Sequence, residues 1–116
     1  MRVLVCGGRD YANWDKIRDT LDALHMKRDI THVITGASNG ADSLADRWAR
    51  WRAVAQTQFP ARWLMHGKAA GPMRNKRMLD EGRPDLVVAF PGGKGTVDMI
   101  RQVRAVGVPV EVVDDV

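Results

Sequence analysis

With 116 residues, the chain is long enough for one compact domain with a hydrophobic core and too short for two domains of ordinary size. Hydrophobic residues make up 45% and charged residues 28%, which excludes the disordered, collagen-like and coiled-coil classes. Because 18 Lys and Arg residues outnumber 14 Asp and Glu residues, the formal charge is +4, which favours an anionic partner such as a nucleotide, phosphate or nucleic acid. We expect a single domain over residues 1–116.

The N-terminal segment and the cysteine content predict a cytoplasmic protein without a membrane segment. The first apolar stretch, residues 3–5, is too short for a signal peptide or a membrane span. Cys6 is the only cysteine, so no intramolecular disulfide can form, as is typical of a reducing compartment. Its apolar neighbours predict that Cys6 is a small buried side chain.

Five short runs rich in apolar and β-branched residues predict strands. They cover residues 2–6, 32–35, 57–59, 86–90 and 110–113. The run at 86–90 is apolar throughout rather than at alternate positions, as expected for a strand that is covered by helices on both faces.

Four segments between these strands predict helices. The first begins after Asn13, a residue suited to the N-cap. The expected apolar faces of the first two helices are Trp14, Ile17, Leu21 and Leu24, and Ala41, Leu44, Ala45 and Trp48. The third is expected at residues 72–81 with Gly82 as its C-cap, and the fourth at residues 96–106 before Gly107.

The alternation of strands and helices predicts the α/β class: a Rossmann-like, doubly wound domain of about five mainly parallel strands flanked by helices. In such folds ligands bind beyond the carboxyl ends of the strands, where the strand order reverses. Candidate functional residues are therefore sought in the loops that follow the strands.

Three of the five predicted strands are followed directly by glycine-rich turns. Glycine allows backbone N–H groups to approach a ligand closely, and a helix N-terminus adds partial positive charge, so these turns suit phosphate. We predict a nucleotide or phosphate site where the turns converge. The candidate binding residues from these turns are Gly7, Gly8, Arg9, Gly36, Ala37, Ser38, Gly40, Pro91, Gly92, Gly93, Gly95 and Thr96.

Further candidate binding residues lie outside the glycine-rich turns. Arg74 and Asn75 stand near a predicted helix start, where a cation and an amide can hold an anionic or ribose group. Lys76 and Arg77 are expected on a solvated helix face. Asp42 can orient a ligand hydroxyl, or it can cap or salt-bridge within its own helix, and the sequence leaves both interpretations open.

Several standard motifs are absent or incomplete. Asp98 occupies the third glycine position of a dinucleotide fingerprint that begins at Gly93, and no P-loop is present. Residues 36–40 satisfy the nucleophile-elbow pattern G-x-S-x-G, but His66 is the only histidine after Ser38, which disfavours a serine hydrolase. The histidines show no metal-ligand spacing, so we predict no metal and no cofactor.

Taken together, four segments resemble the SLOG superfamily, named from the DNA-processing protein DprA and the Lonely Guy proteins, and most closely its YspA/YpsA-related branch. These segments are residues 5–11, 35–42, 67–75 and 91–96. The resemblance implies a Rossmann-like fold that binds a nucleotide or nucleotide-derived ligand, such as an NAD-like or ADP-ribose-like signal or a nucleoside monophosphate. It implies a role in sensing or sequestering that signal.

The same resemblance leaves two alternative functions open. Lonely Guy enzymes are phosphoribohydrolases that use the Glu of a PGGxGTxxE motif, and this chain has Met99 at that position with Asp98 beside it as the candidate catalytic residue. DprA suggests a nucleic-acid-binding module, although basic and aromatic residues do not interleave along any predicted strand. Related Lonely Guy proteins are dimers, so we favour a homodimer to whose interface Trp48 and Trp51 contribute.

Overall fold

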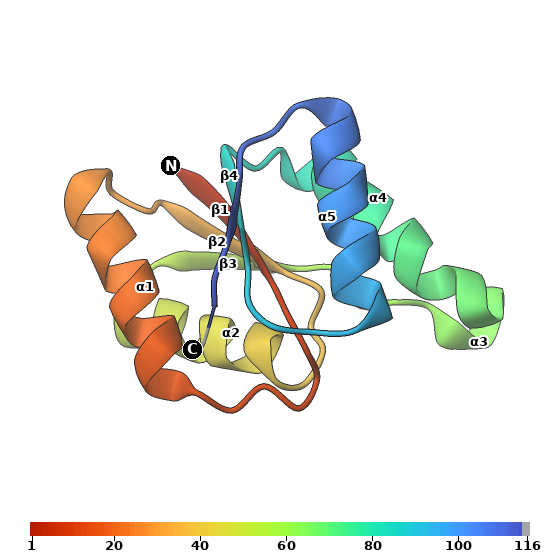
Figure 1. The fold of residues 1–116 in the computed structure, drawn as a ribbon, viewed down its shortest axis with the longest axis horizontal. Coiled ribbons are helices and arrows are strands. Elements are labelled where there is room, and N and C mark those ends of the chain that lie inside the picture. The colour runs from red at the N-terminus through yellow and green to blue at the C-terminus, as the bar shows by residue number, and fades with distance from the viewer. Residues whose placement is uncertain (115–116) are drawn as a thin grey trace.

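The computed structural model describes residues 1–114 and contains, within them, one five-stranded sheet (Figure 1). Its strands are β1 (Arg2–Cys6), β2 (His32–Thr35), β3 (Ala55–Gln58), β4 (Leu86–Ala89) and β5 (Val110–Val112). All pairs are parallel, and the strand order is β3-β2-β1-β4-β5. The predicted doubly wound α/β class is confirmed. The last two residues of the expected 1–116 domain lie outside the described residues.

Helices lie on both faces of the sheet. They are α1 (Trp14–Lys27), α2 (Ala41–Trp51), α3 (Trp63–His66), α4 (Ala70–Gly82) and α5 (Lys94–Val106), with a short 3₁₀ helix, η1 (Gly67–Ala69). Helices α1 and α2 cover one face, and α4 and α5 cover the other (Figure 1). Within residues 1–114, none of these helices is long and apolar enough to span a bilayer.

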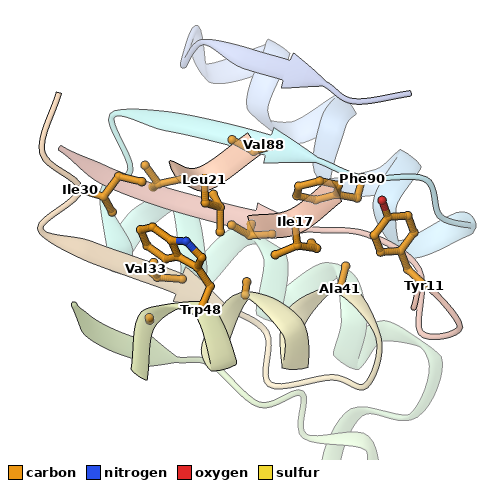
Figure 2. Packing of buried hydrophobic residues seen from close by; sticks show 13 residues of the cluster. Tyr11, Ile17, Leu21, Ile30, Val33, Ala41, Trp48, Val88 and Phe90 are labelled. Atoms are coloured by element: carbon orange, nitrogen blue, oxygen red, sulfur yellow. The ribbon is translucent and has the colours of Figure 1, made fainter. Parts of the chain in front are cut away.

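The side chains of β1 alternate between two hydrophobic clusters, one on each face of the sheet. Val3 and Val5 belong to the cluster beneath α1 and α2 that also contains Trp48. Figure 2 shows Trp48 within this cluster. Leu4 and Cys6 belong to the other cluster, under α4 and α5. Strand β1 is therefore the centre of the core, and its carboxyl end emerges between the two helical layers.

The fully buried Trp48 corrects one expectation about oligomer formation. Its indole Nε1 donates to Asp22 Oδ1 at 2.9 Å, and none of its surface is exposed. Because Trp48 fills the core between α2 and the sheet, it is unable to contribute to an interface between two copies. Trp51 is 53% exposed, so its place in a homodimer stays a prediction.

The predicted N-cap of the first helix and the predicted C-terminal end of the fourth are confirmed, whereas α5 begins at residue 94 and not at 96. Asn13 Oδ1 accepts from Lys16 N at 3.1 Å at the start of α1, and Gly107 adopts a left-handed conformation after α5. Strand β3 begins at residue 55 rather than 57 and ends one residue earlier than predicted, and α3 and η1 were not predicted.

The predicted C-cap of the third helix is wrong. Helix α4 begins at Ala70, two residues earlier than expected, and includes Gly82, while the left-handed cap is Arg83, with φ +49°. The physical reason is packing, because a Cβ on Gly82 would lie 3.2 Å from Ile34 Cγ2. Gly82 therefore allows α4 to approach the sheet instead of ending the helix.

Candidate functional site

A cavity lies at the carboxyl edge of the sheet, between the ends of two neighbouring strands. After β1 the chain turns toward α1 on one face, and after β4 it turns toward α5 on the opposite face (Figure 1). Because the two connections diverge, they leave a crevice of about 740 Å³ between them. This is the position at which doubly wound folds bind ligands, and the volume is in the range of small-molecule sites.

Most of the predicted site residues line this cavity. Those that do are Gly7, Gly8, Arg9, Ser38, Asp42, Arg74, Asn75, Pro91, Gly92, Gly93, Gly95, Thr96 and Asp98. Three predicted residues, Gly36, Ala37 and Gly40, do not line it. The structure therefore brings the first and last glycine-rich turns together at the cavity, whereas the middle turn reaches it through Ser38.

The first and last turns are joined through their backbones. Gly8 N donates to Pro91 O at 2.8 Å. A Cβ on Gly92 would lie 2.2 Å from Thr96 Oγ1 and 2.6 Å from Gly8 N. Only glycine fits at position 92 without a shift, because the β4–α5 turn passes directly against the β1–α1 turn.

The middle turn supports the other walls of the cavity. Gly36 O accepts from Arg74 Nη1 at 2.7 Å, and a Cβ on Gly36 would lie 2.2 Å from that nitrogen. Gly40, at φ +73°, packs against Gly8 and Arg9. Arg74 and the β1–α1 turn thus cover Gly36 and Gly40, and the exposed Ala37 lies outside the cavity lining.

Arg74 is a partly buried cation in the cavity wall. Besides its bond to Gly36, its Nε donates to Asn75 Oδ1 at 3.0 Å. Burial lowers the pKa of Arg74, the charge of Asp42 opposes this shift, and the positive charge of Arg9 lowers it further. Among the described residues no group accepts a hydrogen bond from Nη2. Arg74 also lines the cavity.

Asn75 and Asp98 form a hydrogen-bonded link between α4 and α5. The Nδ2 of Asn75, a residue that is 3% exposed, donates to Gly95 O at 3.2 Å and to Asp98 Oδ2 at 2.9 Å. Asp98 also accepts from Arg101 and Gln102. Burial raises the pKa of Asp98, but the hydrogen bonds from these three side chains outweigh it and lower the pKa overall. Asp98 is therefore held ionised at neutral pH.

Met99, the residue at the glutamate position of the PGGxGTxxE motif, does not face the cavity. It is 1% exposed and packs in the hydrophobic cluster beneath α4 and α5. Position 99 thus belongs to the core, and Asp98 is the acidic residue of this turn that lines the cavity.

Asp42 and Cys6 lie deep in the cavity, and both have raised pKa values. Burial raises the pKa of Asp42 to about 6, although the backbone N–H of Ser38, which donates to Asp42 Oδ2 at 3.1 Å, acts in the opposite direction. Burial also raises the pKa of the Cys6 thiol to about 12, so this thiol stays protonated at neutral pH. Cys6 has the character of a buried apolar residue, as predicted, and not of a nucleophile.

The cavity also contains residues that were not predicted as site residues. Tyr11, Trp63, Lys68 and Lys94 line it. Both lysines stand inside the sequence motifs: Lys94 belongs to a glycine-rich turn that was expected at the site, whereas spacing alone did not indicate that the segment of Lys68 meets this turn. Within residues 1–114, Arg9, Lys68 and Lys94 form no ion pair, and no group of three His, Cys, Asp or Glu residues is placed to hold a metal ion.

The fold and this cavity define a doubly wound α/β protein whose candidate ligand site lies at the reversal of strand order. A model of the YspA, cpYpsA-related SLOG family (YAcAr) matches residues 1–66. The chain belongs to this family, as its motifs predicted.

Two similar proteins extend the comparison beyond the matched segment. The Gene 61 protein of Mycobacterium phage D29 is 37% identical over an aligned length of 118 residues, gaps included. The alignment covers 94% of this chain and 93% of that protein. The solved structure of DNA processing protein A (DprA) from Streptococcus pneumoniae has a TM-score of 0.54 at 16% identity. The match covers 95% of this chain but 58% of the DprA chain, and at this identity it establishes the shared fold alone.

Proposed function

We propose that the chain binds a nucleotide or nucleotide-derived ligand in this cavity and thereby senses or sequesters it. The observation that carries the proposal is the convergence of Arg9, Lys68, Arg74 and Lys94 on one cavity whose wall includes the glycine-rich β4–α5 turn. Arg9 and Arg74 are close enough for the charge of Arg9 to lower the pKa of Arg74. The carboxylate of Asp42 offsets the charge of Arg74 in part, and an anionic ligand would offset the positive charge that remains.

Each part of the cavity has a proposed role. The turn at Gly92, Gly93, Gly95 and Thr96 leads into α5, so its backbone N–H groups and the helix dipole suit a phosphate group. Arg74 presents Nη2 to a second anionic or ribose group, and Asn75 holds Arg74 in place rather than contacting the ligand. Gly7 and Gly8 flank the phosphate from the β1–α1 turn, and Arg9 of the same turn adds its positive charge to the cavity.

Binding is favoured over cleavage of the ligand by the state of Asp98. A general acid must carry a proton at neutral pH, but three hydrogen-bond donors hold Asp98 ionised. With Met99 in the core, the glutamate position of the PGGxGTxxE motif supplies no carboxyl group, so the phosphoribohydrolase hypothesis rests on Asp98. The nucleic-acid hypothesis rests on the DprA fold and the net charge alone.

A thermal-shift panel of AMP, ADP, ATP, NAD, ADP-ribose and cyclic nucleotides tests the proposal, with chromatography of each mixture afterwards. A ligand at one hundred times its Kd is expected to stabilise the protein by about 2.7 kcal/mol, a shift of several degrees for a domain of this size. A shift with intact ligand is the expected result. Released base would favour the phosphoribohydrolase. No shift with any compound contradicts nucleotide binding, and steeply salt-dependent binding of an oligonucleotide would then favour the DprA-like alternative.

A further inference from the structure

An exposed tryptophan and an arginine lie against each other at the cavity. Trp63, the first residue of α3, is 47% exposed and lines the cavity together with Arg9. The guanidinium carbon of Arg9 lies over the indole ring, 5.3 Å from its centroid. An indole and a guanidinium group are both planar, and both stack on nucleobases.

The backbone of α4 leaves room for this indole. Gly71 is buried in the first turn of α4, and a Cβ at this position would lie 3.4 Å from Cη2 of Trp63. The indole edge therefore rests close to the α4 backbone while Arg9 lies over its ring. The next two residues of α3, Leu64 and Met65, are exposed and do not line the cavity, so Trp63 is the residue that α3 directs to the site.

The cavity thus combines two kinds of chemistry. The turn at residues 92–96 offers backbone N–H groups at a helix N-terminus, which suit a phosphate. Trp63 and Arg9 offer an aromatic ring and a planar cation, which suit the face of an aromatic base. A sugar phosphate without a base would bind at the turn and leave Trp63 and Arg9 exposed to solvent.

We propose that Arg9 and Trp63 form the base-recognition element of the cavity, against which the purine or pyrimidine ring of the ligand stacks. This inference rests on the proposed function and narrows it to ligands that carry a base. Every base has a face that can stack, so the pair distinguishes nucleotides from sugar phosphates more strongly than one base from another.

The test compares two pairs of probes. Ribose 5-phosphate lacks only the base of AMP, and inorganic pyrophosphate lacks the whole nucleoside of ADP. Calorimetric titration of the full chain is expected to give a Kd for each nucleotide at least about tenfold lower than for its base-free partner, from the usual contribution of base stacking. Trp63→Leu is expected to raise the Kd for the nucleotides about tenfold and to change the Kd for ribose 5-phosphate less than about twofold. Trp63→Phe, which keeps an aromatic ring, should lie between Trp63→Leu and the wild type.

Two further variants separate stacking from other effects. Arg9→Lys keeps the charge but loses the planar group. It should therefore raise the Kd for AMP more than the Kd for ribose 5-phosphate. Trp51→Leu is the matched control, because Trp51 is 53% exposed and does not line the cavity. Quenching of tryptophan fluorescence by AMP should persist in the Trp51 variant and be lost in Trp63→Leu.

Each contrary result has its own meaning. Ribose 5-phosphate that binds as tightly as AMP overturns the base-recognition element and leaves phosphate binding intact. An equal loss of affinity for AMP and ribose 5-phosphate in Trp63→Leu also overturns it, because Trp63 then acts on the cavity as a whole. If none of the four probes binds and the nucleotide panel gives no thermal shift, the proposed function itself fails.

Discussion

The side-chain amide of Asn75 donates to the carboxylate of Asp98 at 2.9 Å and thereby links α4 to α5 beside the cavity. The two residues are 23 positions apart in the sequence, and Asn75 also holds Arg74 Nε. A single buried amide thus fixes both the cation and the carboxylate of this wall. The positions of the two charges depend on the packing of α4 against α5.

Asp98→Asn is expected to lower the free energy of unfolding by about 1–3 kcal/mol, because its new amide hydrogens would face the donors of Asn75, Arg101 and Gln102. Because folding lowers the pKa of Asp98, the ionised side chain stabilises the folded state above about pH 4. This stabilisation is lost as the pH falls through the folded-state pKa. Urea unfolding at several pH values measures both effects. Asp80→Asn, which breaks an exposed ion pair with Lys76, is the control and should cost less than about 1 kcal/mol.

Asp42→Asn is expected to stabilise the protein at neutral pH. Folding raises the pKa of Asp42 from 3.8 to about 6. Below about pH 4 the side chain is protonated in both the folded and the unfolded state, and its burial carries no charge penalty. As the pH rises through 6 the buried carboxyl group becomes charged, and the free energy of unfolding falls. Above pH 6 the cost to the wild type is of the order of 3 kcal/mol, and asparagine keeps an acceptor for Ser38 N. The difference in free energy of unfolding between variant and wild type should grow from pH 4 to pH 7. A difference that does not vary with pH would exclude burial of the charge as its cause.

Arg74→Gln is expected to weaken nucleotide binding by at least about tenfold, because a hydrogen bond from a charged group to an anionic ligand contributes about 1.5–3 kcal/mol. Titration with the compound that gives the largest shift in the panel measures the effect. Lys76→Gln removes a cation from the same helix, but Lys76 is exposed, pairs with Asp80 and does not line the cavity. Equal losses in the two variants would mean that general charge, and not the placement of Arg74, holds the ligand.

Gly92→Ala and Gly93→Ala form a matched pair in the β4–α5 turn. A Cβ on Gly92 would lie 2.2 Å from Thr96 Oγ1, whereas a Cβ on Gly93 meets nothing within 4 Å. The first variant is therefore expected to lose about 1–3 kcal/mol of stability, and the second to change by less than about 0.5 kcal/mol. Thermal unfolding measured by circular dichroism compares them. Similar melting temperatures would mean that the turn moves away from Gly8 without cost.

The fold could be predicted because its signal is local. Continuous apolar runs such as residues 86–90 indicate strands that are buried on both faces, and the glycine-rich turns after them indicate which edge carries the site. The first and last turns do meet at the cavity, through the bond from Gly8 N to Pro91 O.

The rest of the site depends on contacts that leave no local signal. Gly36 looked like a ligand-binding glycine, but the space beside it is filled by Arg74 from α4, 38 residues later. Trp63 lies on a four-residue helix, which is too short for any periodic pattern. Its proposed role depends on a second segment, the β1–α1 turn, that brings Arg9 over its ring.

The C-terminal end of α4 also depends on tertiary packing that leaves no local sequence signal, and it gives a last prediction. Sequence reasoning placed the cap at Gly82, but tertiary packing against Ile34 puts this glycine inside the helix and leaves Arg83 in the left-handed region at φ +49°. Arg83→Gly should therefore relieve backbone strain and raise the free energy of unfolding by about 0.5–1 kcal/mol. Gly82→Ala should lower it, despite the higher helix propensity of alanine, because the added Cβ would lie 3.2 Å from Ile34 Cγ2. Chemical unfolding of the two variants measures both signs, and stabilisation by Gly82→Ala would mean that helix propensity, and not packing against β2, decides this position.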